Sequence, residues 1–475
     1  MHGDTGRAGY PVGPPPASKS AVHMTQPILP PDDPLRALLH NEVHARPPSR
    51  IRLPALVVYV AVLNEGVTRE AECLHLQRLP GQSALRIEDV QSNFLQLRLA
   101  GQALKWERHS EFTRYSIIQP LPVHALLGAD TPELLSALAI DPAWLRAIPG
   151  RTVAAITLAL VAGGPGSMPG DSPAESPADF PALLAAGRQW FGGRTVVASR
   201  IGSSGGGGPV CAITDFSLQD NGFERMLVIA PPEISPTRAG RISGRLLDLE
   251  TYRLMALRGL PVAKALAPVL HQGETALANI TASLEDAHSS DQVLLDTLIA
   301  LAARVERATA EHGYRFAATQ AYEALVRQRI TELREVALPG TQMIGEFMQR
   351  RLSPAIATVA ATAQRLASLS QRIERASALL RTRVDIATEA QNQQLLSKLT
   401  RGQEMQLRLQ ATVEGLSIAA ISYYVVSLLL YAGKAAHAAG LPVNPEVAAG
   451  ALIPLVLWAV WRTTRKIHDR VQQAE

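Results

Sequence analysis

Two uncharged apolar runs lie close together near the C-terminal end of the chain. The first extends from Gly415 to Gly433, and the second from Val447 to Trp461. A bilayer core about 30 Å thick needs roughly 20 apolar helical residues, at about 1.5 Å of rise each. The first run has that length, and the second reaches it from Leu441 if Glu446 lies among the headgroups. The pattern predicts two transmembrane helices; the alternative interpretation is a buried helical hairpin in a soluble protein.

Basic residues near these runs predict their orientation. The connection at 434–446, which we expect to be the outer loop, holds one lysine, Lys434, and no arginine. The second run is followed by a basic tail at 462–475, and basic residues mark the cytoplasmic side of a membrane protein. Both termini are therefore expected in the cytoplasm. The tail's basic residues are Arg462, Arg465, Lys466 and Arg470.

A helical pattern fills residues 261–414, which we predict to be a helical layer with a long stalk. Gly340 and Thr341 are expected to start a short helix, and Ser353 and Pro354 then provide the N-cap and first-turn proline of the stalk helix. If this helix continues into the first apolar run, it holds about 80 residues and is on the order of 120 Å long. A helix of that length cannot be covered by its own domain. The pattern therefore predicts a homo-oligomer in which copies of the stalk pack together.

The N-terminal half has a different pattern. Residues 1–33 are rich in proline and glycine, predict a disordered tail and lack the apolar core of a signal peptide. Residues 34–260 mix β-rich and helical stretches and predict an α/β domain with a flexible insertion at 163–179. The stretch from Trp106 to Ile117 alternates with period two and predicts one strand. The predicted class is α+β: a cytoplasmic α/β domain, a helical layer with a very long stalk helix, and two C-terminal transmembrane helices.

Composition excludes several classes of function. Two cysteines, Cys73 and Cys211, are too few for a disulfide framework and fit a reducing cytoplasm. A formal charge of +4 with 5% aromatic residues does not give the concentrated basic and aromatic surface of a nucleic-acid-binding protein. The glycine-rich run at 202–208 lacks the Lys-Ser/Thr of a phosphate loop, and the sequence contains no nucleophile elbow or zinc-protease motif. We expect neither an enzyme activity nor a cofactor.

The densest polar cluster precedes the first predicted strand. His40 and His44 are four residues apart, so they share one face of a helical turn, and Glu42 can join them as a third ligand. This spacing is compatible with a metal or phosphate site, and the metal stays unknown. The alternative is a structural cluster that caps the sheet edge and ties down the N-terminal arm. The cluster comprises His40, Asn41, Glu42, His44 and Arg46.

A second polar cluster lies in the predicted strand that begins at Trp106. Glu107, His109 and Glu111 are two residues apart in turn, so a strand places all three on one face. This arrangement suits a ligand-binding site. Ordinary alternation of buried and exposed residues predicts it equally well, so a structural role is the alternative.

Hydroxyl groups lie inside the first apolar run. Ser417 and Tyr424 are seven residues apart, on nearly one helical face, and Ser427 continues that stripe, whereas Ser422 lies off it. Polar residues in a membrane span often mark a pathway, but serine also packs helices together. Ser417, Tyr424 and Ser427 are therefore candidate pore-lining residues.

Four motifs carry a resemblance to a known family. They are Leu35-Arg-Ala-Leu-Leu-His-Asn-Glu-Val-His-Ala-Arg-Pro47, Trp106-Glu-Arg-His-Ser-Glu-Phe112, Leu380-Arg-Thr-Arg-Val-Asp385 and Val413-Glu-Gly-Leu-Ser-Ile-Ala-Ala-Ile-Ser-Tyr-Tyr424. Through them the chain is similar to the uncharacterised bacterial membrane-anchored family called domain of unknown function 3422, over nearly the whole chain apart from its N-terminal tail. The resemblance implies the bacterial inner membrane and brings no assigned activity.

The order of the predicted elements also resembles the CorA-type metal-ion transporters. That resemblance implies a pentamer whose first transmembrane helix lines a pore. Members of that group carry Gly-Met-Asn after the first span, where this chain has Tyr431-Ala-Gly-Lys-Ala435. Two functions follow as hypotheses. One is an oligomeric ion channel or transporter with a cytoplasmic sensing domain; the other is a scaffold or sensor that is anchored in the lipid bilayer, binds a partner or ligand and transports nothing.

Overall fold

The structure, a computed structural model, describes residues 33–36, 39, 47–163, 180–202, 208–285, 290–439 and 444–472. The chain divides into two compact units. The first comprises Met1–Ala265 and His312–Ala363, and the second comprises Leu266–Glu311 and Gln364–Glu475. Each unit is thus built from two stretches that are separate in the sequence.

A mixed sheet forms the framework of the first unit. Within the described ranges its strand order is β2-β3-β4-β1-β5-β8-β7-β6-β9. Neighbouring strands pair antiparallel, apart from the parallel pair β5–β8. Every residue of β1 is buried, which requires that both faces of the sheet are covered there. The strands are β1 (Ala55–Leu63), β2 (Phe94–Leu99), β3 (Gln102–Arg108), β4 (Phe112–Pro120), β5 (Arg151–Ala162), β6 (Val197–Ile201), β7 (Val210–Thr214), β8 (Glu224–Ala230) and β9 (Glu335–Ala337).

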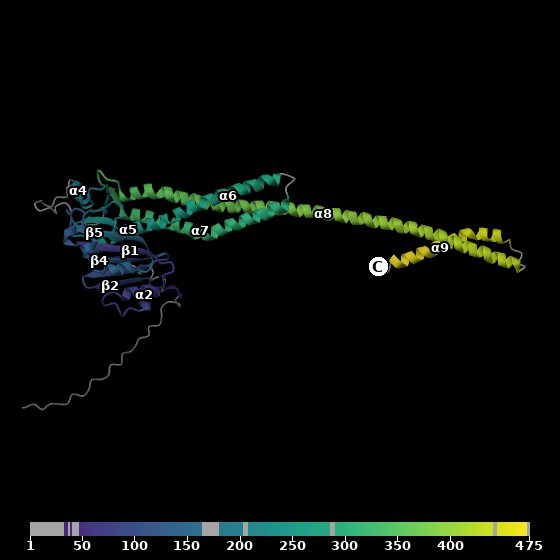
Figure 1. The fold of residues 1–475 in the computed structure, drawn as a ribbon, viewed down its shortest axis with the longest axis horizontal. Coiled ribbons are helices and arrows are strands. Elements are labelled where there is room, and N and C mark those ends of the chain that lie inside the picture. The colour runs from purple at the N-terminus through teal and green to yellow at the C-terminus, as the bar shows by residue number, and fades with distance from the viewer. Residues whose placement is uncertain are drawn as a thin grey trace, which may run out of the picture. The chain divides into compact units, whose positions relative to one another are not determined.

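Helices make up most of the remaining regular structure and, with the sheet, confirm the predicted α+β class (Figure 1). The α-helices are α2 (Arg69–Gln77), α3 (Pro142–Arg146), α4 (Phe180–Trp190), α5 (Pro236–Leu257), α6 (Gly259–Glu285), α7 (Asp291–Leu333), α8 (Ile344–Ala438) and α9 (Pro445–Gln472). Single 3-10 turns lie at Ile87–Val90, Val123–Ala125 and Leu135–Ala137.

Each face of the sheet carries its own hydrophobic core. α5 packs on one face through residues such as Met255 and lies beside β5 (Figure 1). Parts of α7 and α8 complete this layer through Tyr322 and Met348. α2, α3 and α4 contribute to the core on the other face, around the buried indoles of Trp106 and Trp190. α5 is therefore the helix that lies directly over the middle of the sheet.

A close backbone approach holds the segment before β1 against α5. The Ile51 N–H donates a hydrogen bond of 3.0 Å to the Pro236 carbonyl. One turn further along α5, an added Cβ at Gly240 would lie 1.7 Å from the Ser49 carbonyl oxygen. Only glycine permits that approach, so Gly240 lets the segment lie flat on the helix. The segment thereby forms one wall of a cleft.

The single strand predicted from Trp106 to Ile117 is wrong, because these residues form a hairpin. β3 ends at Arg108 and β4 begins at Phe112, and the His109 N–H donates to the Phe112 carbonyl over 2.8 Å. The polar residues of the turn continue the period-two alternation, so the sequence pattern does not show where the strand reverses.

The helical region also departs from its predicted boundaries. It supplies strand β9, and α8 begins at Ile344 instead of at Pro354. A proline inside a helix costs roughly 3 kcal/mol, but Met348 and Leu352 are buried before it, and their packing keeps the helix continuous. At its other end α8 continues through 434–438, expected to be part of the outer loop, because this alanine-rich stretch favours a helix.

The second unit is helical in its described part. Leu270, Leu301 and Leu369, from α6, α7 and α8, are buried, and Arg365 donates hydrogen bonds of 3.0 and 2.8 Å to Glu274. Two helices, α8 and the Pro445–Lys466 part of α9, are long and apolar enough to cross a membrane, by length and composition. They contain the two apolar runs that the sequence predicts as transmembrane helices.

Candidate ligand-binding site

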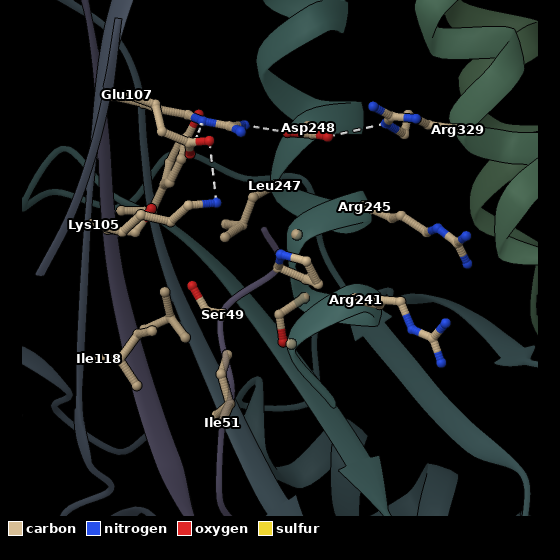
Figure 2. A pocket seen from close by; sticks show the side chains of 18 of the residues that line it. Ser49, Ile51, Lys105, Glu107, Ile118, Arg241, Arg245, Leu247, Asp248 and Arg329 are labelled. Atoms are coloured by element: carbon tan, nitrogen blue, oxygen red, sulfur yellow. Dashed lines mark hydrogen bonds and ion pairs between the residues drawn. The ribbon is translucent and has the colours of Figure 1, made fainter. Parts of the chain in front are cut away.

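A cleft of about 370 Å³ opens in the first unit between the sheet and α5. Strands β1, β3 and β4 form its floor, α5 and the segment at 48–51 form walls, and the end of α7 borders it (Figure 2). Charged side chains are rarely buried unless they are paired. The pairing of the charges that line this cleft therefore decides what it can bind. They are Lys105, Glu107, Arg114, Arg241, Arg245, Asp248, Arg329 and Glu332.

Strand register places the polar groups of the floor. Lys105 on β3 lies opposite Ser116 on β4, which in turn lies opposite Tyr59 on β1. Glu107 and Arg114 form the next such pair between β3 and β4. Because residues two apart on a strand share a face, both rows point toward α5.

Charged side chains of alternating sign extend across this floor and reach α5. Lys105 Nζ lies 3.1 Å from Glu107, and the other carboxylate oxygen accepts from Arg114 Nε over 2.6 Å. Arg114 Nη1 donates in turn to Asp248 on α5 (Figure 2). The floor is thereby tied to the helix above it by hydrogen-bonded ion pairs.

The series of alternating charges continues from Asp248 along the wall of the cleft. Asp248 also accepts from Arg329 Nε of α7 over 3.0 Å, and Arg329 Nη1 donates to Glu332 over 2.9 Å. Arg245 Nε of α5 lies 3.2 Å from the same Glu332 oxygen. Each carboxylate is thus shared by two cations. We call the series Lys105, Glu107, Arg114, Asp248, Arg329, Glu332 and Arg245 the ion-pair network.

Burial makes the members of this network depend on one another. The Glu107 side chain is 1% exposed, and the Arg114 side chain is 12% exposed. Burial alone would raise the pKa of Glu107, but Arg114 and Lys105 outweigh it and lower that pKa to about 2. Burial also lowers the pKa of Lys105, which the Glu107 carboxylate opposes. Removing one partner of such a pair leaves an uncompensated buried charge, which costs about 3–5 kcal/mol.

One basic side chain that lines the cleft has no acidic partner among the described residues. Arg241 is exposed, and within the described ranges its side chain makes no ion pair or hydrogen bond. The lining holds five basic against three acidic side chains, and the hydroxyl-bearing residues Ser49 and Ser116 lie beside them. An excess of fixed positive charge with neighbouring hydroxyl groups suits a small, polar, negatively charged ligand. No group of three or more His, Cys, Asp or Glu that could hold a metal ion occurs in the described part of the chain.

The structure separates the polar cluster predicted in the strand. Glu107 and His109 line the cleft, and the His109 ring stacks on Phe112 with ring centroids 4.5 Å apart. Glu111 lies in the hairpin turn and does not line the cleft; its carboxylate accepts from Arg315 Nη1 of α7 over 2.7 Å. Glu111 therefore pairs the hairpin with α7.

The other predicted site residues lie elsewhere. Ser417 and Tyr424 are exposed on α8, and Ser427 is half-buried. The Ser417 hydroxyl donates to the Val413 carbonyl over 2.9 Å, whereas Ser422, which lies off the predicted stripe, is buried. His40, Asn41, Glu42, His44 and Arg46 lie outside the described residues.

A second group of buried charges lies further along α5, away from the cleft lining. Arg253 donates two hydrogen bonds to the fully buried Glu250 and lies 3.9 Å from Glu224. Burial and the neighbouring Glu250 raise the pKa of Glu224 to about 8. One guanidinium serves two carboxylates here, and the raised pKa of Glu224 reflects this shortage of positive charge.

Sequence reasoning missed most of the ion-pair network. Arg114, Asp248 and Arg329 come from three elements that are far apart in the sequence, and none of them belongs to a motif. One local signal was available on α5, where Arg241, Arg245 and Asp248 recur at helical spacing among apolar residues. A charged stripe on a helix that buries its other faces indicates a site or an ion-pair surface.

A family model described as protein of unknown function DUF3422 matches residues 31–471. The chain belongs to this family. Membership of the DUF3422 family confirms the resemblance carried by the motifs, and the match extends over both units and both long apolar helices. A search of curated proteins finds no match to the chain. The family description names no activity, so the functional argument rests on the cleft.

Replacing Glu107 with glutamine should lower the free energy of unfolding at neutral pH. Folding lowers the pKa of this carboxyl from 4.5 to about 2, which corresponds to on the order of 3 kcal/mol. Because the folded-state pKa is the lower one, this stabilisation is complete above about pH 4.5 and is lost as the pH falls toward about 2.

Urea titrations of the full chain and of Glu107→Gln, purified in detergent at several pH values, measure the effect. The two should differ at pH 7 and converge in acid. A difference that stays constant with pH would contradict the pairing of Glu107 with Arg114 and Lys105.

Proposed function

We propose that this protein is a membrane-anchored sensor that binds a small, polar, negatively charged ligand. The ligand binds in the first unit, which contains the mixed sheet and which we call the α/β unit. The observation that carries the proposal is the cleft, with its ion-pair network and with Arg241 unpaired among the described residues. Apart from Arg241, its charged groups are held in place by one another before any ligand arrives, so binding requires little reorganisation. A volume of about 370 Å³ lies within the range of small-molecule sites.

The position of Glu332 supports a sensing role. Glu332 bonds Arg245 and Arg329 at the cleft and lies in the last turn of α7, just before β9. In β9, Glu335 accepts a hydrogen bond of 2.8 Å from the Gly345 N–H in the first turn of α8. A ligand that draws Arg245 or Arg329 away from Glu332 would therefore act on the connection between α7 and α8.

The anchor is the second part of the proposal. α8 is continuous over 95 residues and contains the first apolar run, and α9 contains the second. In this proposal both runs cross the bacterial inner membrane, and the basic residues after the second run keep both termini in the cytoplasm. Ligand binding in the α/β unit then has a helical path toward the membrane.

A second function, an oligomeric ion channel of the CorA-like kind, is favoured by the side chains exposed on α8. Leu395, Leu399, Leu409 and Val413 recur at heptad positions and are exposed in the single chain. Copies of this chain would cover such a stripe. Tyr424 is also exposed, on the first apolar run, and an oligomer would place it at a shared axis instead of in lipid.

The mass of the detergent-solubilised complex, measured by light scattering, distinguishes the two functions. A monomer excludes a pore on an oligomer axis and leaves the sensor. A pentamer favours the channel and calls for flux measurements in liposomes.

Filling the cleft should abolish ligand binding without unfolding the protein. Gly244 lines the cleft, and an added Cβ there meets nothing within 4 Å. Gly244→Leu would project a side chain into the open space, and replacing a helical glycine adds up to about 1 kcal/mol of helix stability. Thermal unfolding of the full chain in detergent is measured with a panel of dicarboxylates, amino acids, sugar phosphates and nucleotides.

At least one compound should raise the unfolding temperature of the wild type and not that of Gly244→Leu. Gly244→Ala, which adds a single methyl group, is the matched control and should keep the response. Ligand binding in the cleft is disproved if no compound acts on the wild type or if the leucine variant responds equally.

Charges placed in both apolar runs should release the protein from the membrane. An arginine near the centre of a span costs about 3 kcal/mol, so we expect the double variant Ile421→Arg, Leu455→Arg to leave the membrane pellet after an alkaline carbonate wash. The control, Leu396→Arg with Leu407→Arg, changes two exposed leucines of α8 outside the apolar run and should stay in the pellet with the wild type. Release of the wild type itself would refute the anchor.

A further inference from the structure

A second concavity adjoins the cleft on the side of α5 where Arg241 and Arg245 project. It has a volume of about 310 Å³ and shares Arg241, Arg245 and Glu332 with the cleft lining. Four arginines and one carboxylate line it, and the remaining lining is apolar or glycine. We call Arg238, Arg241, Arg245 and Arg334 the arginine pocket.

Helical spacing brings three of these arginines together. Arg238, Arg241 and Arg245 lie at i, i+3 and i+7 in the first three turns of α5, so they share one face. Figure 2 shows Arg241 and Arg245 side by side, extending away from Lys105. The positive end of the α5 dipole lies at the same end of the helix and adds to their field.

The fourth arginine comes from the far end of α7. Arg334 follows that helix directly and has a left-handed backbone with φ of 49°. Such a conformation is uncommon for residues other than glycine. It turns the chain from α7 into β9 and leaves the exposed Arg334 side chain on the border of the pocket, opposite α5.

Two of the four guanidinium groups are held in place by hydrogen bonds. Arg238 Nη2 donates to the carbonyls of Gly202 and Gly208 over 2.9 and 2.8 Å. Arg245 bonds both the carboxylate and the carbonyl of Glu332, over 3.2 and 3.0 Å. These two side chains are therefore oriented before a ligand arrives.

The other two guanidinium groups are available to a ligand. Arg241 and Arg334 are exposed, and neither side chain has an ion pair or hydrogen bond within the part of the chain that the structure describes. Guanidinium forks match the oxygens of a phosphate in pairs, and such charge-assisted bonds are among the strongest. A single carboxylate ligand offers only two oxygens to four arginines, whereas a phosphate or pyrophosphate offers more.

We propose that the arginine pocket binds the phosphate group of a small organic phosphate, a phosphomonoester or pyrophosphate, whose hydroxyl-bearing body lies in the adjoining cleft. This inference rests on the proposed function, because it names the ligand class of the sensor. The cleft offers Ser49, Ser116 and Lys105 to the polar body of the ligand. The same phosphate chemistry belongs to a soluble phosphate ester and to the headgroup of an anionic lipid.

The experiment uses the full chain in neutral detergent, with pyrophosphate, glucose 6-phosphate and phosphate-free glucose as probes at matched ionic strength. Apparent dissociation constants come from the dependence of the unfolding temperature on probe concentration. Pyrophosphate and glucose 6-phosphate should stabilise the wild type, and glucose should not. Arg241→Ala and Arg334→Ala should each weaken pyrophosphate binding about tenfold or more, since each loses a charge-assisted hydrogen bond.

Arg350→Ala is the matched control, because Arg350 is an exposed arginine on α8 that does not line the pocket. Its affinity for pyrophosphate should equal that of the wild type. A second arm replaces the soluble probes with detergent micelles that contain phosphatidic acid. Stabilisation by these micelles alone, lost in Arg241→Ala, supports the pocket with a lipid as the source of the phosphate.

Equal phosphate affinity in the wild type, Arg241→Ala and Arg334→Ala would overturn the inference. If phosphates have no effect but another compound stabilises the wild type and not Gly244→Leu, the inference fails and the proposed sensor stands. If no compound of any class acts on the wild type, both fail.

Discussion

The ion-pair network from Lys105 to Arg245 is the interaction on which the rest of the α/β unit depends. Hydrophobic burial holds α5 on the sheet, but it is not directional. Hydrogen-bonded ions are directional, and this network joins β3 and β4 to α5, and α5 to α7. Buried ion pairs add little net stability compared with apolar residues of the same size, although breaking one is costly. The network is therefore better explained as a device that fixes the geometry of the cleft than as a source of stability.

α5 combines three tasks along one helix. Its apolar residues fill the core against the sheet, Asp248 connects the floor of the cleft to α7, and its first turns present the arginines of the adjoining pocket. Gly240 adds a fourth constraint, because the segment before β1 lies where a side chain would stand. Few positions of α5 are thus determined by helix formation alone. The same helix connects the proposed ligand to α7, and through Glu332 and β9 to the start of α8.

Sequence reasoning succeeded where the signal is local. The apolar runs at 415–433 and 447–461 fall in α8 and α9. Eight of the nine strands within the described residues lie in the region 34–260 that was predicted to be α/β, although two of them, β3 and β4, were predicted as one strand. It failed where the structure depends on pairing between strands or side chains that are not neighbours in the sequence. The β3–β4 turn is concealed by polar residues that keep the alternation, and β9 forms only because β6 offers an edge. Of the predicted cluster, Glu107 and His109 reach the cleft. The ion-pair network that Glu107 joins continues to Asp248 on α5 and Arg329 on α7, at distances in sequence that no local period can show.

The most direct test is a double-mutant cycle on the free energy of unfolding for Asp248 and Arg329, with Asp248→Asn, Arg329→Gln and the double variant. This pair, whose Arg329 and Asp248 side chains are 21% and 12% exposed, should show a coupling energy on the order of 2 kcal/mol. The exposed pair Glu323 and Arg327 on the same helix α7 is the reference, and a pair of that kind couples by about 0.5 kcal/mol. A coupling no larger than that of the exposed pair would contradict the claim that the network fixes the cleft.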